Sequence, residues 1–193
     1  MTGRPFRAAH APGARPPFPV GRLGGPRPCP AIATERLAIG PLGLGDWPAY
    51  RDFMGDPGRT RHMGGPYDLS SAWGWFCADA LSWGMTGAGA AAIRLPGGAL
   101  VGMLSLNDLP AFAEPELGWA LLGGHEGRGY ASEAAGAFLA WIRAEVRPPS
   151  LVSYVDAANP RSENVARRLG ARPDPAAWVP DPDDRAWRHE VTP

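Results

Sequence analysis

The residues best placed to do chemistry lie in a glycine-punctuated turn between a hydrophobic strand pattern and a long helical pattern. The stretch spans residues 116–134 and includes Gly127-Arg128-Gly129-Tyr130. The first turn of a helix has unpaired N–H groups and the positive end of the helix dipole, and glycines let an anion approach the backbone closely. This arrangement predicts a phosphate-binding turn.

The amino-acid composition excludes several kinds of phosphate-binding site. All 19 basic residues are Arg, and the chain contains neither Lys nor Gln. A Gly-Lys-Ser/Thr phosphate loop, a Schiff base and a Ser-Lys pair each need a lysine amine, so all three are excluded. A dinucleotide fold carries its glycines after the first strand of a parallel unit. Here the glycines follow four strand patterns, which argues against that fold.

The elements that must position this turn follow from hydrophobic periodicity. The predicted order is β-α-α-β-β-β-α-β-α-β in a single α/β domain with a mixed sheet. Pro96-Gly97-Gly98-Ala99 indicates a hairpin, and one strand-helix-strand crossover carries the glycine turn. Strands are expected at 33–39, 90–95, 100–106, 116–122, 151–156 and 186–191. Helices are expected at 47–54, 127–146 and 162–169, and a further helix that includes 73–81 begins after Asp68 or Ser70.

Two details of the first helices follow from local chemistry. Asp46 is a candidate N-cap for the helix at 47–54, and Asp68 or Ser70 for the next helix. The second helix carries an apolar stripe with i, i+3, i+4 spacing, which predicts core packing. Its members are Trp73, Phe76, Cys77, Ala80 and Leu81.

Three ordered motifs resemble one superfamily. Gly124-His125-Glu126-Gly127-Arg128-Gly129 resembles the acyl-CoA-binding motif of the GNAT N-acetyltransferases, Gln/Arg-x-x-Gly-x-Gly/Ala, with Gly124 in place of the usual Gln or Arg. The continuation to Ala134, the Thr34-Glu35-Arg36-Leu37 segment and the 159–171 segment resemble the RimJ/RimL branch of ribosomal-protein N-terminal acetyltransferases. The resemblance covers about residues 32–172 and implies a GNAT fold with a mostly antiparallel central sheet.

The resemblance also implies a reaction and a donor site. It implies direct transfer of an acetyl group from acetyl-CoA to a primary amine in a ternary complex, without a metal. A backbone N–H near Leu121 would stabilise the oxyanion. The pyrophosphate would be held by the backbone amides of Glu126, Gly127, Arg128, Gly129 and Tyr130. The Arg128 side chain would add a nearby cation, or lie in solvent.

Three further residues receive roles from the resemblance, each with a structural alternative. Glu116 matches a frequent acidic position and would deprotonate the amine through a water or directly; the alternative is an exposed carboxylate paired with an Arg. Ser162 would protonate the CoA thiolate, and it is also a candidate helix N-cap. Asn159 would bond the pantetheine amide, or serve only as a turn residue before Pro160.

The acceptor side is less defined by the sequence. His62 lies in a loop that shapes the acceptor pocket in this fold, and either lines that pocket or is solvated. Glu133 is expected to pack or to form an ion pair rather than to act in catalysis, and His125 is expected to lie at the surface. Six residues form either an apolar acceptor wall or, by default, the core: Trp47, Tyr50, Phe53, Met63, Tyr67 and Trp73.

Composition bounds the domain and its partners. Residues 1–30 carry five Arg and no acid, with 13 of the chain's 26 Gly and 23 Pro, so we expect a disordered arm followed by one domain over 31–193. The formal charge of the chain is zero, but residues 31–193 carry 14 Arg against 19 acids, or −5, which disfavours nucleic acid as a partner of the folded domain. Cys29 and Cys77 lack metal-ligand spacing, and no apolar run reaches a membrane span. We expect a cytoplasmic monomer or homodimer.

Two other functions remain open at this stage. A non-catalytic acyl-CoA sensor would keep the glycine turn but transfer nothing. A nucleotide-dependent oxidoreductase would bind NAD(P) instead of acetyl-CoA. The acceptor itself, a protein N-terminus or a small-molecule amine, is left undecided by the sequence.

Overall fold

One sheet of eight strands forms the centre of the computed structural model, which describes residues 17–191. The strand order is β1-β2-β3-β4-β5-β6-β8-β7, and β5 and β6 are the parallel neighbours among otherwise antiparallel pairs. This confirms the predicted mixed sheet with one crossover. The strands are β1 (Ile32–Ala33), β2 (Ala38–Pro41), β3 (Gly89–Arg94), β4 (Leu100–Asn107), β5 (Glu116–Leu121), β6 (Val152–Asp156), β7 (Arg172–Pro173) and β8 (Asp184–Arg188).

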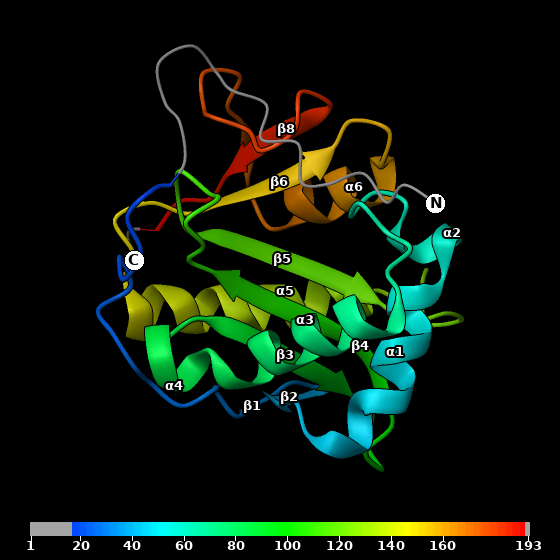
Figure 1. Ribbon diagram of the computed structural model, residues 1–193. Helices are drawn as coiled ribbons and strands as arrows, with labels where there is room; N and C mark the ends of the chain where they lie inside the picture. The colour runs from blue at the N-terminus through cyan, green and yellow to red at the C-terminus, as the bar shows by residue number, and fades with distance from the viewer. Residues whose placement is uncertain (1–16, 192–193) are drawn as a thin grey trace.

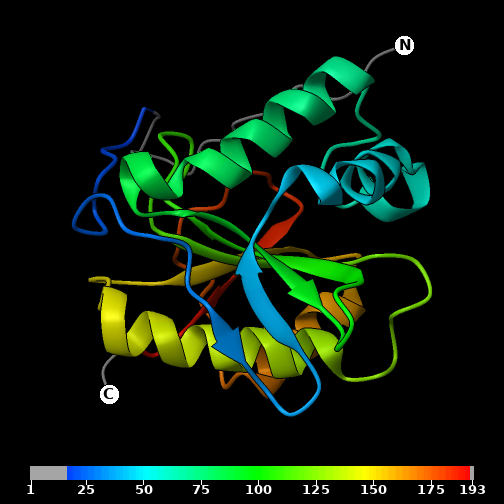
Figure 2. The same cartoon turned by 90° about the horizontal axis from the view of Figure 1, so that it is seen from below.

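Helices cover both faces of the sheet. Figure 2 shows α3 on one face and α5 on the other, with the sheet between them. The helices are η1 (Leu44–Asp46), α1 (Trp47–Gly55), α2 (Pro57–Thr60), α3 (Leu69–Leu81), α4 (Trp83–Thr86), α5 (Tyr130–Trp141), the π-helical η2 (Ile142–Val146) and α6 (Pro160–Arg168). As predicted, Asp68 caps α3, because its Oδ1 accepts from the N–H of Ser71 at 2.7 Å.

The two faces of the sheet carry separate cores. On the α5 face, Leu117 packs with Phe138 and Leu139 of the helix. On the other face, Tyr50 of α1 and Phe76 of α3 pack over Ala92 and Met103. Side chains alternate along a strand, so Glu116 and Ala120 of β5 point toward the α1/α3 face while Leu117 points toward α5.

The predicted first strand and the predicted apolar stripe of α3 both differ from the structure. The strand expected at 33–39 is a tight hairpin of β1 and β2, closed by the Thr34 N–H donating to Leu37 O at 2.8 Å. The apolar stripe of α3 is only partly core. Phe76 is buried, but Trp73 is 41% exposed and Leu81 70% exposed, because α3 covers the sheet with a single narrow face.

The segment before β1 is packed rather than disordered over residues 17–30. Leu23 is 2% exposed and belongs to the core on the α5 face. Arg22 binds Asp108 in the loop after β4, with its Nε 2.6 Å from Oδ1. The prediction of a disordered arm is therefore wrong for this stretch, since an apolar anchor and a buried ion pair hold it. The rest of the predicted arm, residues 1–16, lies outside the described residues.

None of the helices within the described residues 17–191 has the length and apolar character needed to cross a bilayer.

Candidate active site

The parallel strands β5 and β6 separate as they run toward their carboxyl ends (Figure 1). In the described chain their ladder has one register pair, Glu116 with Val152. The Leu122 N–H donates to Val101 O of β4, and backbone groups alternate in direction along a strand. The N–H of Leu121 consequently faces the side where β6 has moved away.

A buried hydrogen-bonded chain holds the two strands together at the closed end. The Ser153 hydroxyl of β6 donates to Leu117 O of β5 at 2.5 Å and lies 2.9 Å from His189 Nε2. Burial lowers the pKa of His189 to about 4, and the charge of Arg143 acts in the same direction. At neutral pH His189 is therefore neutral and able to donate its Nε2–H to Ser153, so the chain fixes the point where the strands diverge.

The glycine turn lies between the open end of β5 and the start of α5. Gly124, Gly127 and Gly129 have φ of 82°, 75° and 81°, a left-handed conformation that favours glycine. Gly129 is the N-cap of α5 and forms no side-chain cap bond. The first turn of this helix therefore presents backbone donors without a side chain of its own to satisfy them.

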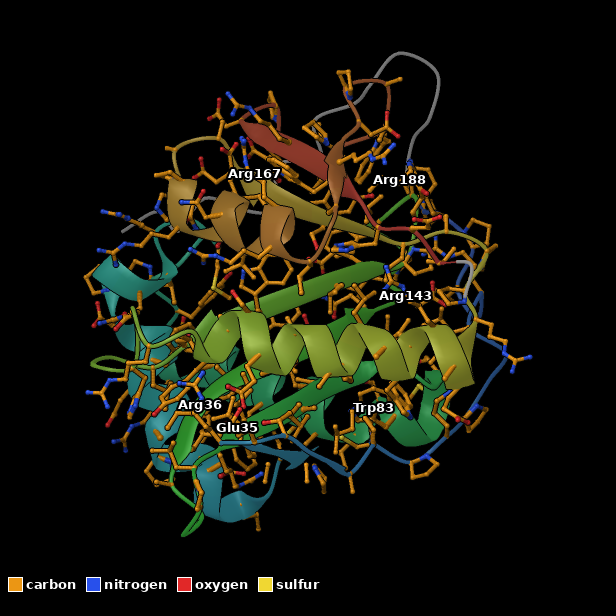
Figure 3. The ribbon with its side chains drawn as sticks, turned by 180° about the vertical axis from the view of Figure 1, so that it is seen from behind. Glu35, Arg36, Trp83, Arg143, Arg167 and Arg188 are labelled. Atoms are coloured by element: carbon orange, nitrogen blue, oxygen red, sulfur yellow. The ribbon has the colours of Figure 1, made fainter. Side chains whose placement is uncertain are left out.

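Arginines from two distant segments approach this turn. Arg36, after β1, donates from Nη1 to Arg128 O at 2.9 Å and from Nε to Glu133 at 2.7 Å, and lies beneath the first half of α5 (Figure 3). The expected ion pair of Glu133 is thus confirmed. Arg59 of α2 forms an ion pair with Glu126 of the turn. His125, expected at the surface, is half-buried.

Glu116 is a buried carboxyl on the α1/α3 face. It is 8% exposed, and Asn107 of β4 donates to its Oε2 at 2.6 Å. Burial raises the pKa of Glu116 to about 7, the Asn107 hydrogen bond opposes this, and the charge of Asp184 adds to it. Oε1 lies only 3.3 Å from where a side chain on Gly118 would begin. The alternative of an exposed carboxylate paired with Arg is therefore wrong.

The Asn-x-x-Ser motif opens α6, beyond the carboxyl end of β6. Asn159 is the N-cap, because its Oδ1 accepts from the Ser162 N–H at 3.2 Å. Its Nδ2 donates to the Ser162 hydroxyl oxygen at 3.1 Å. The prediction of Ser162 as N-cap is wrong, and the capping role of Asn159 leaves the Ser162 hydroxyl hydrogen free to donate.

The segment after α2 reaches β6. His62 Nδ1 lies 2.6 Å from Asp156 Oδ2, and His62 Nε2 accepts from Arg61 Nε at 2.8 Å. Burial would raise the pKa of Asp156, but hydrogen bonds from His62 and from the Ala158 N–H lower it. His62 is thus a structural contact between the two segments and not a solvated loop residue.

The candidate acceptor wall is divided between core and surface. Tyr50 and Phe53 are buried in the α1/α3 core, as the default predicted, and Trp47 and Tyr67 pack against it. Met63 is exposed. Three described residues near the site were not anticipated from the sequence: Asn107, Asp156 and Arg59. The pairing of β4 with β5 places Asn107 opposite Glu116, but the long loop between these strands concealed that register.

A glycine turn that opens a helix beside two diverging parallel strands defines an acyl-CoA N-acyltransferase fold. The chain belongs to the GNAT acetyltransferase family: residues 36–172 match its acetyltransferase (GNAT) domain. It is accordingly an acetyl-CoA-dependent N-acetyltransferase. The described residues contain no group of three or more His, Cys, Asp or Glu side chains able to hold a metal ion.

Solved structures share the fold. An acetyltransferase from Agrobacterium tumefaciens str. C58 is 48% identical, with a TM-score of 0.79 over 83% of this chain and 94% of that one. A spermidine N-acetyltransferase from Vibrio cholerae, in complex with CoA and spermine, is 12% identical with a TM-score of 0.65 over 80% and 94%. RimL, a ribosomal L7/L12 alpha-N-protein acetyltransferase in complex with CoA, is 15% identical with a TM-score of 0.66 over 84% and 97%.

Proposed function

We propose that this enzyme transfers the acetyl group of acetyl-CoA directly to a primary amine, with both substrates bound at once. The observation that carries the proposal is the position of Glu116. Its buried carboxyl lies on β5, the same strand whose Leu121 N–H faces the opening toward β6. A proton acceptor and an oxyanion donor thus share one rigid element, as acyl transfer to an amine requires.

The donor site is assigned to the turn and the strand edge. The amides from Glu126 to Tyr130 bind the pyrophosphate, since this turn has left-handed glycines and precedes a twelve-residue helix. Arg128 adds positive charge at the exposed side of the turn. The Leu121 N–H binds the thioester oxygen as it becomes negative. Asn159 keeps one N–H of its side-chain amide for pantetheine beyond its bonds to Ser162.

The protons are assigned to two side chains. The acceptor arrives as an ammonium ion, and Glu116 takes one proton from it, directly or through a water, so that the nitrogen lone pair attacks the thioester carbon. The carbon–sulfur bond then breaks, the electron pair stays on sulfur, and the nitrogen releases its second proton to solvent as the neutral amide forms. Ser162 donates its hydroxyl proton to the leaving thiolate and recovers one from solvent. No covalent acetyl-enzyme forms in this route.

Two acceptor classes fit this proposal. The RimJ/RimL-like motifs favour a protein N-terminus, the kind of substrate named for RimL. Small-molecule amines are the other class, and a polyamine is bound in the Vibrio cholerae structure. Both share an unprotonated primary amine as the attacking group.

An acetyl-CoA-dependent thiol-release assay tests the function. The purified full chain is supplied with N-terminal peptides, polyamines and aminoglycosides, and products are identified by mass spectrometry. We expect acetylated amine and free CoA in equal amounts with at least one class. Tight CoA binding without transfer to any amine on the panel would instead favour the non-catalytic sensor.

A further inference from the structure

An ion pair lies across the turn proposed to bind the donor phosphates. Arg59 comes from α2, and Glu126 lies inside the turn itself. About a third of each side chain is exposed, at 32% and 30%. The pair therefore joins two segments that are far apart in sequence.

The carboxylate of Glu126 occupies part of the turn's donor surface. Its Oε2 accepts from the backbone N–H of Gly124 at 3.1 Å. The Arg59 guanidinium lies against Gly123, with Nη2 3.2 Å from where a side chain there would begin. An anion from the protein thus sits where backbone amide and guanidinium converge, and this convergence is what a phosphate group requires.

A phosphate entering the turn meets that carboxylate as a like charge. Two negative groups at contact distance repel, whereas a guanidinium binds phosphate through paired N–H donors. Arg59 can pair fully with Glu126 or with a phosphate oxygen. A phosphate that took the Gly124 amide and the Arg59 guanidinium would replace Glu126 at both of these contacts.

We propose that Arg59 is a phosphate-binding residue for the donor and that Glu126 is an internal anion that the donor displaces. This inference rests on the proposed assignment of the turn to the pyrophosphate. Glu126 then has two opposite effects: its backbone N–H binds the donor, while its side chain competes with it.

The α2 segment lies beside both strands that border the proposed donor site. Arg59 holds the turn after β5, and His62, three residues later, holds Asp156 at the end of β6. The α2 segment therefore contacts both strands that border the proposed donor site. A donor that captures Arg59 replaces one of these two contacts with a contact to itself.

Two variants with opposite expected signs test the proposal. Arg59→Gln removes the phosphate ligand, and we expect the Kd for CoA, measured by titration calorimetry, to rise about tenfold. Glu126→Gln removes the competing charge and keeps the side-chain size, and we expect the Kd to fall about threefold. Arg51→Gln is the matched control, since Arg51 is an exposed arginine on α1 paired with its neighbour Asp52. It should leave the Kd unchanged.

Truncated ligands identify which part of the donor Arg59 contacts. With S-acetylpantetheine, which has no phosphate, the KM of Arg59→Gln should equal that of the wild type. With dephospho-CoA, which keeps the pyrophosphate but lacks the 3′-phosphate, the tenfold effect should persist if the pyrophosphate is the ligand. If the tenfold effect of Arg59→Gln disappears with dephospho-CoA, the group that Arg59 contacts is the 3′-phosphate and not the pyrophosphate.

The outcomes separate this inference from the proposed function. A purely structural ion pair would make both variants weaken CoA binding, and a higher Kd for Glu126→Gln would overturn the inference while leaving acetyl transfer intact. An equal effect of Arg59→Gln on S-acetylpantetheine would overturn it too. If the wild-type chain binds no CoA, the proposed function and the inference both fail. Circular dichroism spectra and Tm values show whether each variant keeps the fold of the wild type.

Discussion

Glu116 lies in an environment that is unfavourable for a charged carboxyl group. A charged carboxylate this deep in a protein is unfavourable, and one hydrogen bond from Asn107 offsets only part of that. The result is a pKa of about 7, raised first by burial. A base with a pKa near the working pH is half ionised there and accepts a proton readily. The same environment means that the ionised Glu116 side chain lowers the stability of the folded state.

Replacing Glu116 by Gln should abolish the pH dependence that this group imposes on the rate. In the wild type kcat/KM should rise with pH through about 7, because the carboxyl must lose its proton to act as base. Glu116→Gln should lower kcat/KM by about 100-fold and remove that step. Initial rates from pH 5.5 to 9 measure this, with Glu35→Gln, an exposed acid, as the control. An unchanged profile would exclude Glu116 as the base.

The same variant should be more stable than the wild type at high pH. The folded-state pKa lies above the unfolded value, so the native state binds more protons. Wild-type stability should therefore fall as pH rises from about 4.5 to about 7 and stay level above that. Glu116→Gln lacks this loss. Between pH 5 and pH 8, the free energy of unfolding of the variant should therefore rise by roughly 3 kcal/mol relative to that of the wild type. Urea unfolding at both values measures it; parallel curves would contradict burial of the carboxyl.

Asn107 should tune this base without contacting either substrate. Its hydrogen bond stabilises the carboxylate form and lowers the pKa of Glu116. Asn107→Ala should therefore move the rising limb of kcat/KM to higher pH by about one unit, with activity partly restored at pH 9. Asn164→Ala, at an exposed site on α6, is the control. A uniform loss of rate at every pH would indicate a structural role only.

At the scale of elements, the start of α5 determines the conformation of the glycine turn. Gly129 caps this helix with φ of 81°, and its position beside Arg36 leaves little room for a side chain. Ser153 and His189 act at the opposite end of β5, where they fix the point of strand divergence. The turn and the divergence together border the proposed donor site between β5 and β6.

A methyl group at position 129 should damage the turn, whereas one further along the same helix should not. Gly129→Ala forces a left-handed conformation on alanine, and we expect a loss of about 1–2 kcal/mol of stability and weaker CoA binding. Gly136→Ala lies inside α5, where the new methyl would be 3.8 Å from Leu169, an ordinary contact. The free energy of unfolding of Gly136→Ala should be about 0.5–1 kcal/mol higher than that of the wild type. Tm measures the stability of each variant and titration measures its affinity for CoA. Equal changes in the two variants would contradict a specific requirement for glycine at position 129.

At the scale of the whole molecule, residues before β1 are part of the folded domain. Asp108 is fully buried on its side-chain atoms and Arg22 is 16% exposed, so each neutralises the other away from solvent. Arg22 also donates to the carbonyl oxygen of Ala113 at 2.5 Å. These bonds tie the N-terminal segment to the loop between β4 and β5, the two strands that carry Asn107 and Glu116.

Breaking this tie should cost much more than breaking a surface pair. Arg22→Gln leaves the carboxylate of Asp108 buried without its cation, and we expect a loss of about 3–5 kcal/mol in the free energy of unfolding. Arg51→Gln breaks the exposed pair with Asp52 and should change stability by less than about 1 kcal/mol. Urea denaturation compares the two. Similar small losses would mean that the segment from residue 17 is not held as described.

Sequence alone determined the features that depend on neighbouring residues. The glycine turn, the helix that follows it, the hairpin at Pro96-Gly97-Gly98-Ala99 and the Asp68 cap all follow from local backbone preferences, so their patterns are visible in short windows. The order of these elements was sufficient to predict the mixed sheet with its one crossover.

Only the tertiary structure decided which groups meet. The burial of Glu116 and its bond to Asn107 depend on the β4–β5 register, which the loop between them does not reveal. The Arg59–Glu126 and Arg22–Asp108 pairs join residues more than sixty positions apart. Such contacts arise from packing across the whole chain, and the pKa of a buried group follows from that packing and not from its neighbours in sequence.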